Sequence, residues 1–220
     1  MSFSRTDAEM EVARDQKPEV GGRKFAFRSE GFTLIELLVV ITIIVVLMGL
    51  LFPAFRGVQD QAKKTQAKND LAQIVTAVNA YYTEYGKYPI TATIDTTLGP
   101  GGSPTSNETL FNPLRGLDLA LNPRQIVFLS PPDAKDAANP RSGIGTTTST
   151  GQYFDPWGKN YVIRIDGDYD NDVPNPYSSN AGNTPKLRNG VIAWSLGTDQ
   201  AGGMGDKKAG TAADDVISWQ

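Results

Sequence analysis

The stretch GFTLIELLVVITIIVVLMGLLF, Gly31–Phe52, is an apolar run with one carboxylate, Glu36, near its start. Its other polar residues are Thr33 and Thr42. At ~1.5 Å per residue, a helix of this length just crosses a hydrocarbon core ~30 Å thick. The run therefore predicts a single transmembrane helix over residues 32–53.

Basic residues gather on the amino-terminal side of this run, at Arg23, Lys24 and Arg28. Under the positive-inside rule this flank is cytoplasmic, and the carboxy-terminal part lies across the membrane. A cleaved secretory signal is the rival interpretation, but it needs a shorter apolar core followed by a small-x-small site. Residues 53–56, PAFR, offer no such site.

Helical patterning continues beyond the membrane run, over residues 54–86. Apolar side chains recur there at three- and four-residue spacing, which is typical of an amphipathic helix. Gly86, followed by Pro89, supplies the expected stop. We expect one helix over residues 32–85, with a bend at Gly49 and Pro53. The residues of the apolar stripe are Leu71, Ile74, Val75, Val78, Tyr81, Tyr82 and Tyr85.

Residues 87–220 are expected to form a globular head. Residues 90–152 are rich in Gly, Pro, Ser and Thr and predict loops, with a short helix at 108–114 and a short ordered segment at 125–130. Further on, β-branched and aromatic runs predict an antiparallel sheet. Its strands are Tyr161–Ile165, Val191–Ser195 and Val216–Trp219.

The sheet and the amphipathic helix each have one face to bury, so they are natural packing partners. The sequence therefore predicts an α+β fold. In this fold a long amino-terminal helix, half transmembrane and half amphipathic, packs on a small carboxy-terminal sheet in the manner of a lollipop.

Composition excludes several classes of function. The chain has no cysteine and no histidine, which removes thiol nucleophiles, disulfides, imidazole bases and the usual zinc sites. No Walker A loop is present, and a net charge of −3 gives no basic surplus for nucleic acid. We therefore expect neither an enzyme nor a nucleic-acid binder. Any metal site must use oxygen ligands, which favours calcium or magnesium.

The letters G-F-T-L-I-E at the start of the apolar helix are similar to the processing signature of the type IV pilin and pseudopilin superfamily. The resemblance implies that residues 1–31 are a leader, that prepilin peptidase cuts after Gly31, and that Phe32 is then methylated. It also implies an assembly role for Glu36, and Pro53 falls where the family's helices carry a proline. The expected protein is pilin-like, with an inner-membrane anchor and a periplasmic head.

Physical chemistry supplies a reason for the carboxylate. Cleavage leaves an ammonium group on Phe32, and Glu36 of a neighbouring subunit can neutralise it, so that neither charge is buried alone. The alternative is that Glu36 lies close enough to the cytoplasmic interface to reach polar surroundings by itself.

Residues 194–219, WSLGTDQAGGMGDKKAGTAADDVISW, together with DPWG at 155–158, resemble the major pseudopilin of type II secretion, the G subunit. In that family a calcium ion pins the final loop. Asp206, in the middle of the loop, has a weaker claim to be a ligand. The ligands that the resemblance implies are the side chains of Asp199, Asp214 and Asp215 and the backbone carbonyls near Leu196 and Val216.

A second acidic group lies in IDGDYDND, residues 165–172, and resembles the opening of an EF-hand. Asn171 replaces the sharp-turn glycine, however, and Tyr177 stands where a bidentate glutamate should close the loop. An ion site and a solvated acidic turn both stay open. The carboxylates are those of Asp166, Asp168, Asp170 and Asp172.

The expected function is that of a structural subunit, a major pseudopilin that polymerises with copies of itself into a periplasmic pseudopilus for type II secretion. Its expected partners are minor pseudopilins, prepilin peptidase, the inner-membrane assembly platform and membrane lipid. One alternative is a type IV pilin or competence-type pseudopilin for adhesion or DNA uptake. Another is an uncleaved, single-pass protein whose head binds a ligand on a platform of Trp157, Trp194 and Trp219, residues that otherwise pack in the core.

Overall fold

The computed structural model describes residues 31–147 and 149–220, without the side chains of residues 52–54. The expected leader, apart from its last residue, lies outside the described residues, as do the basic residues that flank the apolar run. The chain divides into two compact units, of which the first ends at Met48 and the second comprises Gly49–Gln220.

Helix α1, Leu34–Tyr85, is continuous through Gly49 and Pro53. The prediction of one long helix is confirmed, whereas the bend stays a prediction. The backbone of Gly86 has a φ of 66°, which glycine adopts without a Cβ clash, and its amide donates to the carbonyl of Tyr82 at 2.8 Å. Gly86 therefore ends the helix, as the sequence predicts.

The carboxy-terminal part of α1 buries one face in the head. The fully buried side chains follow one another at intervals of four, three, four and three residues, which keeps them on one side of a helix. The predicted apolar stripe is thus confirmed at its buried positions, whereas Val75 and Tyr85 are partly buried and Tyr82 is 39% exposed. The buried residues are Ala67, Leu71, Ile74, Val78 and Tyr81.

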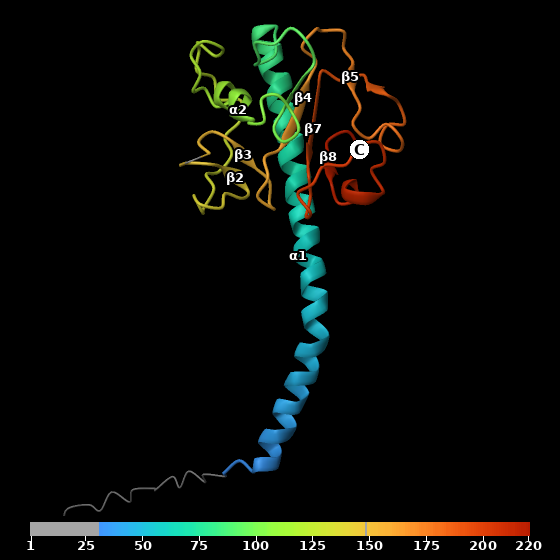
Figure 1. Cartoon of the computed structure of the whole chain (residues 1–220). Helices are drawn as coiled ribbons and strands as arrows, with labels where there is room; N and C mark the ends of the chain where they lie inside the picture. Colours follow the sequence, from blue (N-terminus) through green and yellow to red (C-terminus); the bar gives the residue numbers. More distant parts are fainter. Residues whose placement is uncertain (1–30, 148) are drawn as a thin grey trace, which may run out of the picture. The chain divides into compact units, whose positions relative to one another are not determined.

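A four-stranded antiparallel sheet, with strand order β1-β4-β7-β8, lies beside this part of α1 (Figure 1). The three predicted strands are confirmed, although β8 is shorter than expected. Strand β1 is a correction, because it belongs to the region predicted as loop; its three residues, TTL, are too few to show an alternation. The bounds are β1 Thr96–Leu98, β4 Val162–Ile165, β7 Val191–Ser195 and β8 Val216–Ile217.

Smaller elements complete the head. The predicted helix is confirmed as α2, Glu108–Leu114. Residues 125–130 form no strand, but the amides of Phe128 and Leu129 donate to the carbonyl of Leu114 at 2.9 and 3.1 Å. The other elements are the pair β2 Gly143–Ile144 and β3 Tyr153–Phe154, the pair β5 Val173–Pro174 and β6 Lys186–Leu187, and the 3-10 turn Gly210–Ala212.

Alternate residues of the sheet point to two different cores. Ile163, Ile165 and Ala193 face α1, whereas Ile192 and Trp194 face the opposite side. Segments from the long carboxy-terminal loops cover that second side, so both faces of the sheet are buried. They contribute Val173, Tyr177, Ala181, Leu196 and Ala212.

Asn107, just before α2, joins three parts of the head. Its side chain is fully buried, and its amide nitrogen donates to the carbonyls of Tyr153 and Tyr161 at 3.1 and 2.9 Å. Its amide oxygen accepts from the backbone nitrogen of Tyr153 at 3.0 Å. One buried side chain thereby forms hydrogen bonds with three backbone groups.

Replacing Asn107 with alanine should destabilise the head by at least about 2 kcal/mol, because buried backbone groups would lose their partners. Urea unfolding of the detergent-solubilised chain, followed by aromatic fluorescence, measures the change. Asn79→Ala, on the exposed face of α1, is the matched control and should have little effect. Equal unfolding midpoints for the two variants would contradict the role assigned to Asn107.

Candidate functional site

The start of α1 is closed by a reciprocal pair of side chains. The backbone and hydroxyl of Thr33 donate to the carboxylate of Glu36 at 2.8 and 2.7 Å. The amide of Glu36 donates back to the Thr33 hydroxyl at 3.3 Å. Since the carbonyl of Thr33 accepts from the amide of Leu37, Thr33 is the N-cap and the arrangement is a capping box.

The capping box gives Glu36 a local partner that we did not predict, although the spacing T-x-x-E indicates it in the sequence. The carboxylate lies in the first helical turn, where the helix dipole favours a negative charge. Just before it, the Phe32 side chain is 81% exposed, and a Cβ placed on Gly31 would meet no described residue beyond its chain neighbours within 4 Å. The predicted pairing of Glu36 with Phe32 of another subunit stays a prediction.

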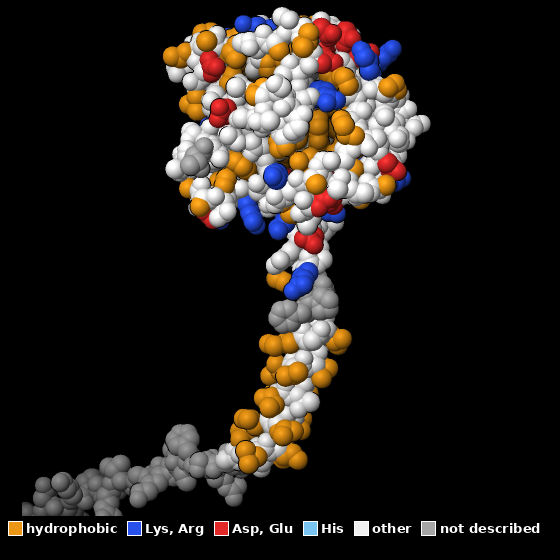
Figure 2. Space-filling view, viewed as in Figure 1, with side chains coloured by type: hydrophobic (Ala, Val, Ile, Leu, Met, Phe, Trp, Pro, Cys, Tyr) orange, Lys and Arg blue, Asp and Glu red, His pale blue; other side chains and the backbone are white. Residues whose placement is uncertain are grey.

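The first part of α1 exposes apolar side chains along its length, from 43% at Ile44 to 90% at Leu34. Figure 2 shows this apolar surface, which is free of lysine and arginine until the helix approaches the head. Among the described residues, α1 is the helix that is long and apolar enough to cross a membrane. These properties fit a protein anchored by a single span.

The final loop brings together the three side chains predicted to bind calcium. One carboxylate oxygen from each of Asp199, Asp214 and Asp215 lies within 4.8 Å of the others. Leu196 directly follows β7 and Val216 begins β8, and the pairing of Ser195 with Val216 closes the loop on itself. The fold thus places the ends of the loop beside each other.

Asp215 is the buried member of this cluster, with 4% of its surface exposed. Its Oδ2 accepts a hydrogen bond from the Tyr177 hydroxyl, whereas its Oδ1 is buried without a partner among the described residues. Burial, with Asp214 nearby, raises the pKa of Asp215 to about 6. A cation would supply what the unpartnered oxygen lacks, so the residues fit a hard metal ion.

Asp214 is held in place by the turn that follows β7. Its Oδ2 accepts from the backbone amides of Thr198 and Asp199, the latter at 3.0 Å. A Cβ on Gly197 would lie 2.6 Å from the same carboxylate, and the backbone there has a φ of 65°, so glycine is required. Asp206 is bonded elsewhere, to the side-chain amide of Asn180, and is not part of the cluster.

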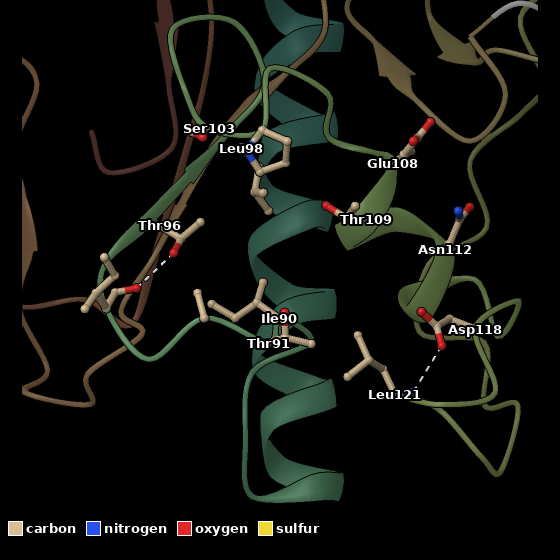
Figure 3. A pocket seen from close by; sticks show the side chains of 13 residues that line it. Ile90, Thr91, Thr96, Leu98, Ser103, Glu108, Thr109, Asn112, Asp118 and Leu121 are labelled. Carbon is tan, nitrogen blue, oxygen red and sulfur yellow. Dashed lines mark hydrogen bonds between the residues drawn. The ribbon is translucent and has the colours of Figure 1, made fainter.

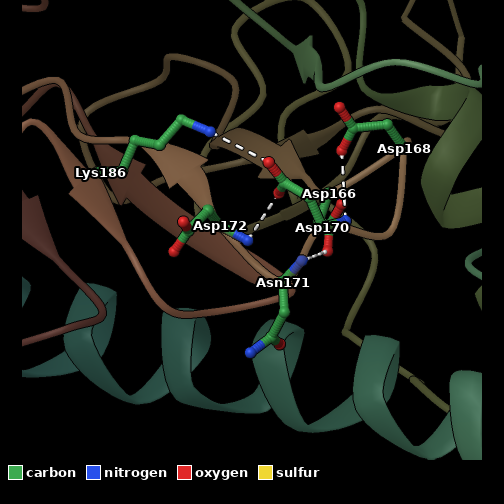
Figure 4. A network of polar contacts seen from close by, with 6 residues as sticks. All are labelled: Asp166, Asp168, Asp170, Asn171, Asp172 and Lys186. Atoms are coloured by element: carbon green, nitrogen blue, oxygen red, sulfur yellow. Dashed lines mark hydrogen bonds and ion pairs between the residues drawn. The ribbon is translucent and has the colours of Figure 1, made fainter.

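The acidic turn at 165–172 does not close as an EF-hand does. Asp170 pairs with Lys186 at 3.0 Å and accepts from the amide of Asp172 at 2.8 Å, as Figure 4 shows. Only Asp166 and Asp168 come together, and their third neighbour is Asp95, which the sequence analysis did not single out. No local spacing marks Asp95, because it lies about seventy residues away.

The head also contains a groove lined by residues 90–98, α2 and residues 118–121 (Figure 3). Its lining mixes aliphatic side chains with threonines and the carboxylates of Glu108 and Asp118. The tryptophans do not line it: Trp157 and Trp194 are 5% and 6% exposed, and Trp219 packs against Tyr177 and Trp194. The interpretation as core residues is confirmed for Trp157 and Trp194, whereas Trp219 is half-buried against the core.

Comparison with known proteins gives matches to part of the chain. The model described as prokaryotic N-terminal methylation motif matches residues 27–52. The type IV major pilin protein PilA of Myxococcus xanthus is 33% identical over 93 residues, which are 42% of this chain and 36% of that protein. Type II secretion system core protein G of Pseudomonas aeruginosa is 41% identical over 64 residues, which are 29% of this chain and 45% of that protein.

The type IV major alpha-pilin of Moraxella bovis is 36% identical over 88 residues, which are 40% of this chain and 55% of that protein. The chain thus spans between 36% and 55% of the length of these relatives. No solved structure matches the chain. The methylation motif at the start of an exposed apolar helix, together with the similarity to both pilins and core protein G, supports the type IV pilin and pseudopilin superfamily for this chain.

Proposed function

We propose that this chain is a major pseudopilin, which polymerises into a periplasmic filament of a type II secretion system. Proteins of this family are structural subunits, and the chain is not an enzyme. The observation that carries the proposal is Glu36, an exposed carboxylate in the first turn of an otherwise apolar helix. Such a group in a membrane needs a partner.

The capping box explains how Glu36 is tolerated before assembly. In the single chain, Thr33 supplies the hydrogen bonds that lipid cannot. After cleavage, the ammonium group of Phe32 on a neighbouring subunit offers a full positive charge, which a hydroxyl cannot match. The capping box therefore holds the carboxylate at the helix start, and assembly replaces or supplements its local partner.

The final loop favours the pseudopilin branch of the superfamily. We assign a calcium ion to this loop, with the side chains of Asp199, Asp214 and Asp215 as ligands. Backbone carbonyls near Leu196 and Val216 would complete its coordination. The gathering of the three carboxylates and the unpartnered oxygen of Asp215 support this assignment. A periplasmic head, with the amino terminus in the cytoplasm, would meet calcium at concentrations that extracytoplasmic modules use.

A type IV pilin is the second candidate, because relatives named as pilins in Myxococcus xanthus and Moraxella bovis align with 40% or more of this chain. Loss of protein export after deletion of the chain, with no change in surface fibres, favours the pseudopilin. Loss of long surface fibres with normal export favours the pilin.

Processing should remove residues 1–31 and leave a mature chain that begins with N-methylated Phe32. Intact-mass measurement of the membrane protein tests this. Gly31→Leu should block cleavage, since a bulky residue would stand at the cut, whereas Gly49→Ala should be processed normally. A wild-type chain that keeps residues 1–31 in membranes would contradict the proposed function.

Glu36→Gln should abolish most filament formation while leaving the head folded, because glutamine keeps an oxygen for Thr33 but loses the charge. Stranding the partner ammonium costs about 3–5 kcal/mol if the pair is buried. Thr33→Val, which loses the hydroxyl but keeps the charge, should still assemble. The yield of sheared filaments measures both; wild-type yield from Glu36→Gln would exclude a docking role.

Calcium should raise the melting temperature of the detergent-solubilised chain relative to chelator. At a hundredfold excess over Kd, one ion contributes about 2.7 kcal/mol. Asp199→Asn should reduce this rise, because it removes a ligand from an exposed position of the cluster. Asp206→Asn, in the same loop but outside the cluster, is the matched control. Identical rises for the two variants would exclude the proposed final-loop site.

A further inference from the structure

A second group of carboxylates meets at the other end of the sheet. Asp95 directly precedes β1, whereas Asp166 and Asp168 lie in the acidic turn that follows β4. One carboxylate oxygen from each lies within 4.8 Å of the others. This group shares no residue with the final loop.

The pairing of β1 with β4 brings these residues together. Thr96 pairs with Ile165, so one further step along both strands places Asp95 opposite Asp166. The backbone of residue 94 comes so close to Gly167 that a Cβ there would lie 2.0 Å from the carbonyl of Ile94. Glycine at position 167 therefore permits the close approach that brings Asp95 to the turn.

Two of the three carboxylates each have one oxygen without a partner. Asp166 is 2% exposed; its Oδ2 accepts from the amide of Asn171 at 2.8 Å, but its Oδ1 is buried without a hydrogen bond among the described residues. The Oδ1 of Asp95 is likewise buried without a hydrogen bond among the described residues. Buried acceptors are costly to leave unpaired, and this cost is greater for charged groups.

The nearby cationic side chains are engaged elsewhere. Lys186 is directed at Asp170, as Figure 4 shows, with the nitrogen 3.0 Å from the carboxylate. Arg164 donates to the Thr97 hydroxyl at 2.7 Å and to the carbonyl of Pro174 at 2.6 Å. Within residues 31–147 and 149–220, no salt bridge reaches any of the three carboxylates.

We propose that Asp95, Asp166 and Asp168 bind a calcium ion, at a site separate from that of the final loop. Three carboxylates offer up to six oxygens, and calcium accepts six to eight in flexible geometry. Asp168 is exposed, so water can complete the coordination from its side. Magnesium demands a stricter octahedron and retains its own water, so it should bind more weakly.

The ion would fix the acidic turn on the chain segment that follows α1. The ring of Tyr169, inside the turn, stacks on Tyr88 with centroids 5.5 Å apart, and its hydroxyl accepts from the Tyr88 amide at 3.2 Å. Calcium would thus join β1, the turn and residue 88.

Calcium binding to the full detergent-solubilised chain, stripped with chelator and titrated in a calorimeter, tests the site. Asp168→Asn and Asp95→Asn should each weaken one binding event roughly tenfold or more, because each removes a charged ligand. Asp168 is exposed and Asp95 half-buried, so these variants disturb folding less than a change at Asp166. Asp172→Asn, in the same turn but outside the group, should bind as the wild type does.

The proposed site would be contradicted if Asp168→Asn or Asp95→Asn bound calcium as tightly as Asp172→Asn does. It would also be contradicted if Asp172→Asn lost as much calcium affinity as the other two variants. Loss in Asp168→Asn alone would mean a site within the turn, and would also overturn the three-residue assignment. Magnesium that competes equally with calcium would overturn the choice of ion.

Asp199→Asn separates this site from the one in the final loop. With both sites present, the wild type shows two binding events, Asp168→Asn and Asp199→Asn each weaken a different one, and the variant that combines them weakens both. One ion that is lost in Asp168→Asn and kept in Asp199→Asn supports this site and removes the final-loop assignment. The reverse pattern overturns this site and leaves the final-loop assignment in place.

Discussion

The head depends on the burial of one face of α1 against a sheet that cannot stand alone. The sheet has four strands, the longest of five residues, and sheets of this size need a covering layer. The face of α1 from Ala67 to Tyr81 is that layer, and Ile163, Ile165 and Ala193 pack on it. The buried side chains of α1 begin at Ala67, and the earlier residues of the helix are free of this constraint, which lets the same helix carry a membrane segment.

Polar side chains organise the loops that the helix and sheet leave unfixed. Asp155 is fully buried, and its Oδ1 accepts from the amides of Trp157, Gly158 and Lys159 at 2.7 to 2.9 Å. Its other oxygen accepts from the Ser195 hydroxyl at 2.6 Å. A buried carboxylate can therefore be fully satisfied by this chain, so the unpartnered oxygens of other buried aspartates are exceptions that need a cause.

Periodicity explains how much of the fold could be predicted. The apolar run, the stripe on α1 and the strands β4 and β7 each repeat one signal over several residues, so tertiary context could not reverse them. Strand β1 has three residues and no such repeat. The role of Asp95 could not be predicted for a related reason. Its place beside Asp166 depends on the β1–β4 register, which no local pattern specifies.

The site residues likewise divide into those that a local motif predicts and those that only the folded chain brings together. The motif around Gly31 and Glu36 is contiguous, so the sequence predicts it directly, and even the missed capping box is a local spacing. Asp199, Asp214 and Asp215 could be grouped only through resemblance, since fourteen residues separate Asp199 from Asp214. Their meeting follows from the return of the chain from β7 to β8, which is a property of the folded head.

Both proposed roles place the missing partner outside the chain. Glu36 would find a second subunit only after cleavage has freed an ammonium group, and the acidic clusters would find calcium only where that ion is abundant. Asp166 and Asp215 thus resemble Glu36 in one respect: each has an oxygen or a charge that the chain alone does not fully compensate. The partner of Glu36 would become available only in the membrane after processing, and calcium only on the periplasmic side, so a subunit that has not been inserted and processed would lack both partners.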